Sequence, residues 1–126
     1  MPYKITWLDQ TVIADFYGDV TVQEIRDHGK EINSDSRFKN VSKRISNCSR
    51  ITSINASSSD LKIFAFIDSD IAKYAPDAHM AVVSENPGII KNTAEYKAAF
   101  GDGAWQIELF SSVGDALAWD PESTLP

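Results

Sequence analysis

The sequence contains few of the residues that bind metals or attack substrates. Its 126 residues include one cysteine, Cys48, and two histidines, His28 and His79. A single cysteine cannot form an internal disulfide, and a zinc site needs more Cys or His ligands than these spacings supply. No glycine-rich phosphate loop or nucleophile elbow occurs in the sequence. We therefore expect no metal or other cofactor, and the sequence favours a non-enzymatic protein.

Positive charge and long apolar runs are also scarce. Twelve Lys and Arg residues stand against 18 Asp and Glu residues, giving a formal net charge of −6 that repels phosphate backbones and anionic headgroups. No apolar run approaches the ~18 residues of a membrane-spanning helix. The N-terminal stretch MPYKITWLDQ lacks the charged start and apolar core of a signal peptide. These features predict a cytoplasmic protein with no nucleic-acid partner and no membrane insertion.

The length and composition suit one ordinary globular domain. The chain is 43% hydrophobic and 24% charged, and it has no internal repeat and no linker-like segment. We expect one domain over residues 1–120. Residues 121–126, which begin with Pro121, are expected to form a loose tail.

Strand-like and helix-like segments alternate along the chain. Residue types that favour strands predict strands at Tyr3–Trp7, Val12–Tyr17 (ended by Gly18 and Asp19), Lys43–Cys48, His79–Ser84 and Trp105–Phe110. Capping residues followed by apolar residues at helical spacing predict helices after Thr21, from Ser58 to Tyr74, after Asn86 and after Ser112. The order β-β-α-β-α-β-α-β-α predicts an α/β fold: a mainly parallel five-stranded sheet with an antiparallel first strand, covered by helices.

The helix expected from Ser58 to Tyr74 has two residues out of pattern. Its apolar arc is formed by Leu61, Ile63, Phe64, Ile67, Ile71 and Tyr74. Phe66 falls outside this arc, so it is not expected in the core and is a candidate for a pocket lip or a dimer face. Asp68 falls inside the arc, where a carboxylate needs a hydrogen-bonding partner or a water-filled opening.

The chain resembles the SpoIIAA-like proteins, also called STAS/SEC14-domain proteins. The resemblance rests on MPYKITW, FYGDVTVQEI, RISNCSRITSINASSSDL, AVVSENP and WQIELFSSVGDALAW, and it covers essentially the whole chain. It implies a SpoIIAA-like fold. It also implies one of two functions: an interaction or regulatory module resembling anti-sigma-factor antagonists, or a carrier of small apolar ligands resembling SEC14-type domains.

The resemblance also directs attention to a run of serines. In the antagonists, a partner kinase phosphorylates a serine within an Asp-Ser-Ser-Gly-Leu pattern at a helix start. Aligning on Leu61 places Ser58 and Ser59 on the two serines, Ser57 on the Asp and Asp60 on the Gly. Serine is also a preferred N-cap residue, so capping from Ser57 or Ser58 is the simpler explanation of the run.

The remaining candidate sites follow from the expected topology. Because ligands of open α/β sheets bind beyond the carboxyl ends of parallel strands, one rim is expected to gather Asn47, Cys48, Ser57 to Ser59, Ser84 to Asn86, Ser111 and Ser112. Asn47 stands where relatives often have an Asp. Phe66, Asp68 and Asn47 are therefore candidates for a pocket or dimer face, and the partners left open are a protein, a second copy in a homodimer, or a small apolar ligand.

Overall fold

The sheet of the computed structural model, which describes residues 3–101 and 105–120, has five strands that follow one another in chain order. β1 pairs with β2 in antiparallel fashion and the other pairs are parallel, which confirms the predicted sheet. The strands are β1 (Tyr3–Leu8), β2 (Thr11–Thr21), β3 (Lys43–Asn55), β4 (His79–Val83) and β5 (Ile107–Phe110). The predicted tail, 121–126, lies outside the described residues.

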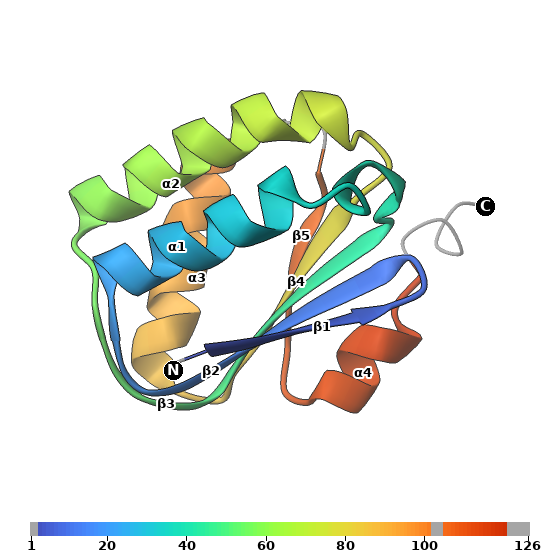
Figure 1. Cartoon of the computed structure of the whole chain (residues 1–126). Coiled ribbons are helices and arrows are strands. Elements are labelled where there is room, and N and C mark those ends of the chain that lie inside the picture. The colour runs from blue at the N-terminus through green and yellow to red at the C-terminus, as the bar shows by residue number, and fades with distance from the viewer. Residues whose placement is uncertain (1–2, 102–104, 121–126) are drawn as a thin grey trace.

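Helices cover both faces of this sheet: those of the parallel crossovers lie on one face, and the helix after the last strand lies on the other (Figure 1). Three helices lie on one face and a short one on the other, as Figure 1 shows. They are α1 (Val22–Ser34), α2 (Ser58–Ile71) and α3 (Pro87–Phe100) on the first face, and α4 (Val113–Ala118) on the second. Short 3₁₀ turns follow α1 at Phe38–Asn40 and α2 at Ala72–Tyr74. Within the described ranges, no helix combines the length and apolarity needed to cross a membrane.

The predicted helix starts are confirmed. Capping boxes begin α1 and α2, in which Thr21 pairs with Glu24 and Ser57 pairs with Asp60. The side chain of Asn86 caps α3, and the Ser112 hydroxyl accepts from the Asp115 amide at the start of α4. Each cap satisfies backbone N–H groups that have no partner within the helix.

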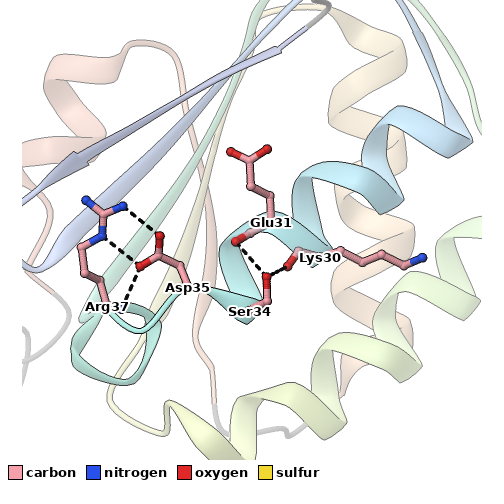
Figure 2. A network of polar contacts seen from close by, with 5 residues as sticks. All are labelled: Lys30, Glu31, Ser34, Asp35 and Arg37. Atoms are coloured by element: carbon pink, nitrogen blue, oxygen red, sulfur yellow. Dashed lines mark hydrogen bonds and ion pairs between the residues drawn. The ribbon is translucent and has the colours of Figure 1, made fainter.

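The end of α1 is fixed by local polar contacts (Figure 2). The Ser34 hydroxyl donates to the Lys30 carbonyl at 2.7 Å, and the Asp35 carboxylate accepts two bonds from the Arg37 guanidinium. The pairing with Arg37 holds the pKa of Asp35 down at about 2. The same guanidinium lies 4.3 Å from the centre of the Trp7 ring, so this turn is joined to β1.

β2 and β3 run further than predicted, so two sequence interpretations were wrong. Gly18 adopts a positive φ of 65° and bends β2 instead of ending it, and β3 continues past Cys48 to Asn55. The pairing shifts register after Asp15 and again after Gly18, with the extra residue on β3 each time. Such β-bulges bend a strand and increase its twist. The result is a curved two-stranded arm, formed by residues 17–21 of β2 and 50–55 of β3. This arm carries the chain away from β4 before α2 begins (Figure 1).

The two faces of the sheet have separate cores. The helix-rich face buries the larger cluster, which includes Phe16, Leu61, Phe64, Tyr96 and Trp105. The α4 face buries a small, tight cluster of Ile13, Ile45, Ala81, Val83 and Ala116. Side chains of successive strand residues therefore alternate between two distinct environments.

Candidate functional site: a cavity under α1, α2 and α3

The orientation of α2 differs in part from the predicted one. Leu61, Phe64 and Ala65 are buried, whereas Ile63 and Ile67 are 43% and 42% exposed. The expected apolar arc was therefore wrong in part: Ile63 and Ile67 lie at its exposed margins, whereas Asp68 faces inward with Leu61 and Phe64, as predicted. Phe66 is 77% exposed, so the prediction that it lies outside the core is confirmed.

A cavity of about 130 Å³ lies between the helices and the sheet. We call it the inner cavity, and its walls are mostly apolar, with contributions from β2, β3, β4 and all three helices of this face. The curved arm supplies Val20, Ile51 and Ile54 to the wall, so the two bulges shape this space.

A second, larger space of about 370 Å³ lies between α1 and α2. We call it the outer groove. Its lining includes Arg26, Lys30 and Asn33 of α1 and Ile67 of α2. The inner cavity and the outer groove share five lining residues, which are Ile25, His28, Arg44, Phe64 and Asp68. The two spaces therefore adjoin along these five residues.

Asp68 has the partner that its position requires. The Tyr96 hydroxyl of α3 donates to its Oδ2 at 2.6 Å. Burial, together with the neighbouring Asp68 carboxylate, raises the pKa of Tyr96 well above its usual value, so the hydroxyl keeps its proton. The bond joins α2 to α3 at the cavity wall.

Arg44 of β3 is the one positive charge shared by the inner cavity and the outer groove. It is only 3% exposed, and its Nη1 donates to Oδ1 of Asn33 at 3.1 Å. The guanidinium carbon lies 5.8 Å from the centre of the Trp105 ring. No carboxylate of the described residues forms a salt bridge with it. A buried cation without a counter-ion is costly, because the lost hydration is not replaced by an opposite charge.

His28 of α1 lies beside this guanidinium and is buried as well. Desolvation, reinforced by the Arg44 charge, lowers the pKa of His28 to about 3, so the imidazole is neutral near pH 7. Its Nδ1 contacts the Ile25 carbonyl, which can only accept, so the proton sits on Nδ1 and Nε2 is an acceptor. The ring packs edge-on against Phe16, with 4.8 Å between ring centres.

Cys48 also lines the inner cavity. Burial raises the pKa of its thiol to about 12, so very little thiolate is present at neutral pH. Since the thiolate is the reactive form, the environment of Cys48 suits an apolar wall and opposes a nucleophilic role.

The three candidate serines lie at the end of the β2–β3 arm, away from the inner cavity lining. Ser57 is confirmed as the helix cap: its hydroxyl accepts from the Asp60 amide at 3.1 Å. The Ser58 hydroxyl donates to Glu95 of α3 at 2.9 Å, so it faces a carboxylate. Ser59 is exposed.

Asn47 lies on the opposite face of the sheet from Asp68. Its partner in β4 is Val83, a member of the α4-side core, and the residue is only 8% exposed. Its amide nitrogen donates to Asp15 at 2.7 Å, and its oxygen accepts from both the amide and the hydroxyl of Ser49. Asn47 therefore fastens the first bulge of β3.

The structure does not gather the predicted rim into one site. The arm separates Ser57, Ser58 and Ser59 from Asn47, while α4 begins on the other face of the sheet (Figure 1). Phe66, Asp68 and Asn47 do not come together either, since Phe66 points outward and Asn47 lies on the α4 side. The physical reason is the extra length of β3, which moves the start of α2 well beyond the end of β4.

Sequence reasoning missed Arg44, His28 and Tyr96 as site residues. A signal for Arg44 was present: in KRISNC, the position of Ile45 fixes one buried face, so Arg44, Ser46 and Cys48 must share the other. All three line the inner cavity.

Comparisons with known proteins identify the class of fold. No family model matches the sequence, and no curated protein matches it significantly. Solved structures do match, and they define an α/β domain of the SpoIIAA-like type.

Three of these structures cover nearly the whole chain. The anti-sigma-factor antagonist SpoIIAA in its unphosphorylated form superposes with a TM-score of 0.64 at 14% identity, over 92% of this chain and 94% of that one. The Bacillus cell fate determinant SpoIIAA in its phosphorylated form gives 0.60 at 12% identity, over 92% and 96% of the two chains. An uncharacterised DUF3478 protein from Shewanella loihica PV-4, described as SpoIIAA-like in fold, gives 0.55 at 12% identity, over 93% and 90%.

Likenesses at this level of identity show the fold alone, because one fold hosts many functions. The fold predicted from the resemblance is confirmed, and the function must be argued from the site.

Proposed function

We propose that this protein is a non-enzymatic module that binds a small molecule with an apolar body in the inner cavity. The observation that carries the proposal is the cavity itself: about 130 Å³ of mostly apolar space, which adjoins a second space between two helices and shares five lining residues with it. Small-molecule sites have this character, namely apolar walls with a few convergent polar groups. Of the two functions that the resemblance implies, the cavity favours the ligand carrier.

Native mass spectrometry of protein purified from its own host tests this proposal. We expect a bound small molecule that is released on denaturation. The variant Ser46→Leu, which fills the cavity from β3, should lose that molecule while keeping the fold. Ser36→Leu, at an exposed site outside the cavity, is the matched control and should keep it. Wild-type protein free of any ligand across repeated preparations would contradict the proposal.

The outer face of α2 supports a second function, a protein interaction. Exposed apolar side chains occur at Ile63, Phe66 and Ile67 of α2 and at Tyr74 of the 3₁₀ turn that follows it, with exposures of 43%, 77%, 42% and 70%. Large exposed apolar side chains at helical spacing are typical of interfaces. We propose that this face binds a protein partner or a second copy in a homodimer.

Sizing chromatography of Phe66→Glu tests self-association. If α2 forms a homodimer interface, the variant should elute as a monomer while wild type elutes as a dimer. The control is Lys62→Glu, an exposed change on α2 that keeps Phe66. Tyr17→Glu is less suitable, because Arg50 stacks on that ring. Equal elution volumes for wild type and Phe66→Glu would refute the dimer.

A regulatory phosphosite at Ser58 or Ser59 remains a proposal that rests on the resemblance. At Ser58 a phosphate would replace the bond to Glu95 with a repulsion, which would loosen the contact between α2 and α3. A partner that reads this site should distinguish Ser58→Ala from Ser58→Asp in a pull-down. Equal capture of both variants would count against regulation.

A further inference from the structure

The hydrogen bonds of Arg44 leave one edge of its guanidinium free. Nη1 is used by Asn33, whereas Nε is fully buried and has no partner among the described residues. No hydrogen bond to Nη2 is formed by the described residues either. Nε and Nη2 form one side of the planar guanidinium, so two parallel donors point away from the bond to Asn33.

A carboxylate matches this edge in charge and shape, and Nη2 is the donor that it meets first, because Nε is enclosed by the surrounding protein. The approach to Nη2 passes Gly29 of α1: a Cβ built there would lie 3.8 Å from this nitrogen, and any longer side chain would cover it. Gly29 and Arg44 both line the outer groove, and the absence of a side chain at Gly29 leaves space beside Nη2.

The charges of the outer groove favour an anion. Three of its lining residues are cations, Arg26, Lys30 and Arg44, and one is a carboxylate, Asp68. This local excess of positive charge occurs in a chain whose formal net charge is −6. Because one carboxylate, Asp68, also lines this groove, a singly charged carboxylate is a better ligand than a dianionic phosphate.

We propose that Arg44 anchors the carboxylate of a small monocarboxylic acid whose apolar body fills the inner cavity. This inference rests on the proposed ligand-binding function and names its ligand class. An engineered cavity of ~150 Å³ accepts benzene, so an inner cavity of about 130 Å³ suits an apolar body of similar size. The carboxylate, and any part of the apolar body that does not fit the inner cavity, would lie in the outer groove. The bound carboxylate supplies the counter-ion that Arg44 lacks.

Calorimetric titration of the full chain with octanoate and octanamide tests the anchor. The two probes match in size and differ in charge, so octanoate should bind wild type about tenfold or more tightly than octanamide does. Arg44→Met removes the charge and keeps most of the side-chain length. It should lower the affinity for octanoate to that for octanamide and leave octanamide binding unchanged.

A second variant keeps Arg44 and changes only its charge balance. Asn33→Asp places a carboxylate against Nη1, so it should weaken octanoate binding several-fold with no effect on octanamide. Arg50→Met is the matched control on the same strand, since Arg50 is exposed, stacks on Tyr17 and lies outside the cavity lining. This control should bind both probes as wild type does.

The outcomes separate the anchor from ligand binding itself. Equal affinity of wild type for octanoate and octanamide would refute the anchor and leave the ligand-binding cavity standing, as would tight octanoate binding by Arg44→Met. If neither probe binds wild type, the monocarboxylate assignment is wrong, and the mass spectrum of host-purified protein then decides independently whether the cavity holds another ligand.

Discussion

β3 carries two buried polar side chains on its opposite faces, and the structure treats them differently. Asn47, on the α4 side, has partners in Asp15 and Ser49 for both its amide nitrogen and its oxygen. Arg44, on the helix-rich side, has one partner, and its Nε has none. Buried polar groups are normally satisfied. The contrast therefore marks Asn47 as a structural residue and Arg44 as a residue that awaits a ligand.

The largest expected effect tests how tightly the α4 face is packed. Ile45 is fully buried there, so Ile45→Ala should lower the free energy of unfolding by about 3 kcal/mol, through lost burial and the cavity left behind. Ile54→Ala, at a half-buried position beside the inner cavity, should lose only about 1 kcal/mol. Urea unfolding measures both, and equal losses would contradict the difference in packing between the faces.

A direct comparison of the two polar residues comes next. Asn47→Ala leaves Asp15 and the bulge at Ser49 without their partner, so it should destabilise by about 2 kcal/mol. Arg44→Met should be neutral or stabilising, because replacing a poorly paired buried charge with an apolar side chain removes a desolvation cost. A loss for Arg44→Met as large as that for Asn47→Ala would mean that Arg44 is structural.

The pH dependence of stability tests the polar residues buried on the helix-rich face, because His28 lies beside Arg44 there. In the folded protein the pKa of His28 is about 3, below the usual 6.5 of an exposed imidazole, so below pH 6.5 the unfolded chain binds the proton first. The stabilisation is complete above pH 6.5 and falls as the pH decreases toward 3, by up to about 1.4 kcal/mol per pH unit. Between pH 6.5 and pH 5 the expected loss is about 1.5 kcal/mol.

The variant His28→Leu isolates this contribution. It removes the titrating group from the buried site, so unfolding free energies measured at pH 6.5 and pH 5 should differ less than they do in wild type. An unchanged difference would show that other groups set the acid sensitivity.

The smallest expected effect concerns the start of α2, at the end of the β2–β3 arm. Ser57→Ala removes the cap at the start of α2 and should cost about 1 kcal/mol in urea unfolding. Ser59→Ala, at an exposed neighbour without a capping bond, should change stability by less than about 0.5 kcal/mol. If Ser59→Ala lost as much stability as Ser57→Ala, the assignment of Ser57 as the capping residue would be contradicted.

The sequence carried enough local information to predict the fold but not to place the site. Capping residues and strand periodicity act over a few residues, so Thr21, Ser57, Asn86 and Ser112 were identified correctly. The length of β3 depends on its pairing with β2 through two bulges, and that pairing is not local. For this reason the residues of the predicted rim do not lie together in the structure.

The orientation of α2 was harder to predict for a related reason. Apolar residues lie around much of the circumference of this helix, so periodicity alone does not indicate which of them face inward. The contact between Asp68 and Tyr96 sets the rotation of the helix, and it joins residues that are 28 positions apart. Tyr74, which is 70% exposed, lies beyond α2 in the 3₁₀ turn, where the periodicity of an α-helix no longer applies.

The curved arm has a consequence for solubility. Pairing between β3 and β4 ends at Asn47, so the outer half of β3 pairs only with β2 and has the character of an edge strand. Unpaired edges invite the addition of a strand from another molecule, and bulges and charged side chains oppose this. The two bulges and the exposed Arg50 lie within this half. The irregularities that shape the cavity are thus also features that oppose the addition of a strand from a neighbouring molecule.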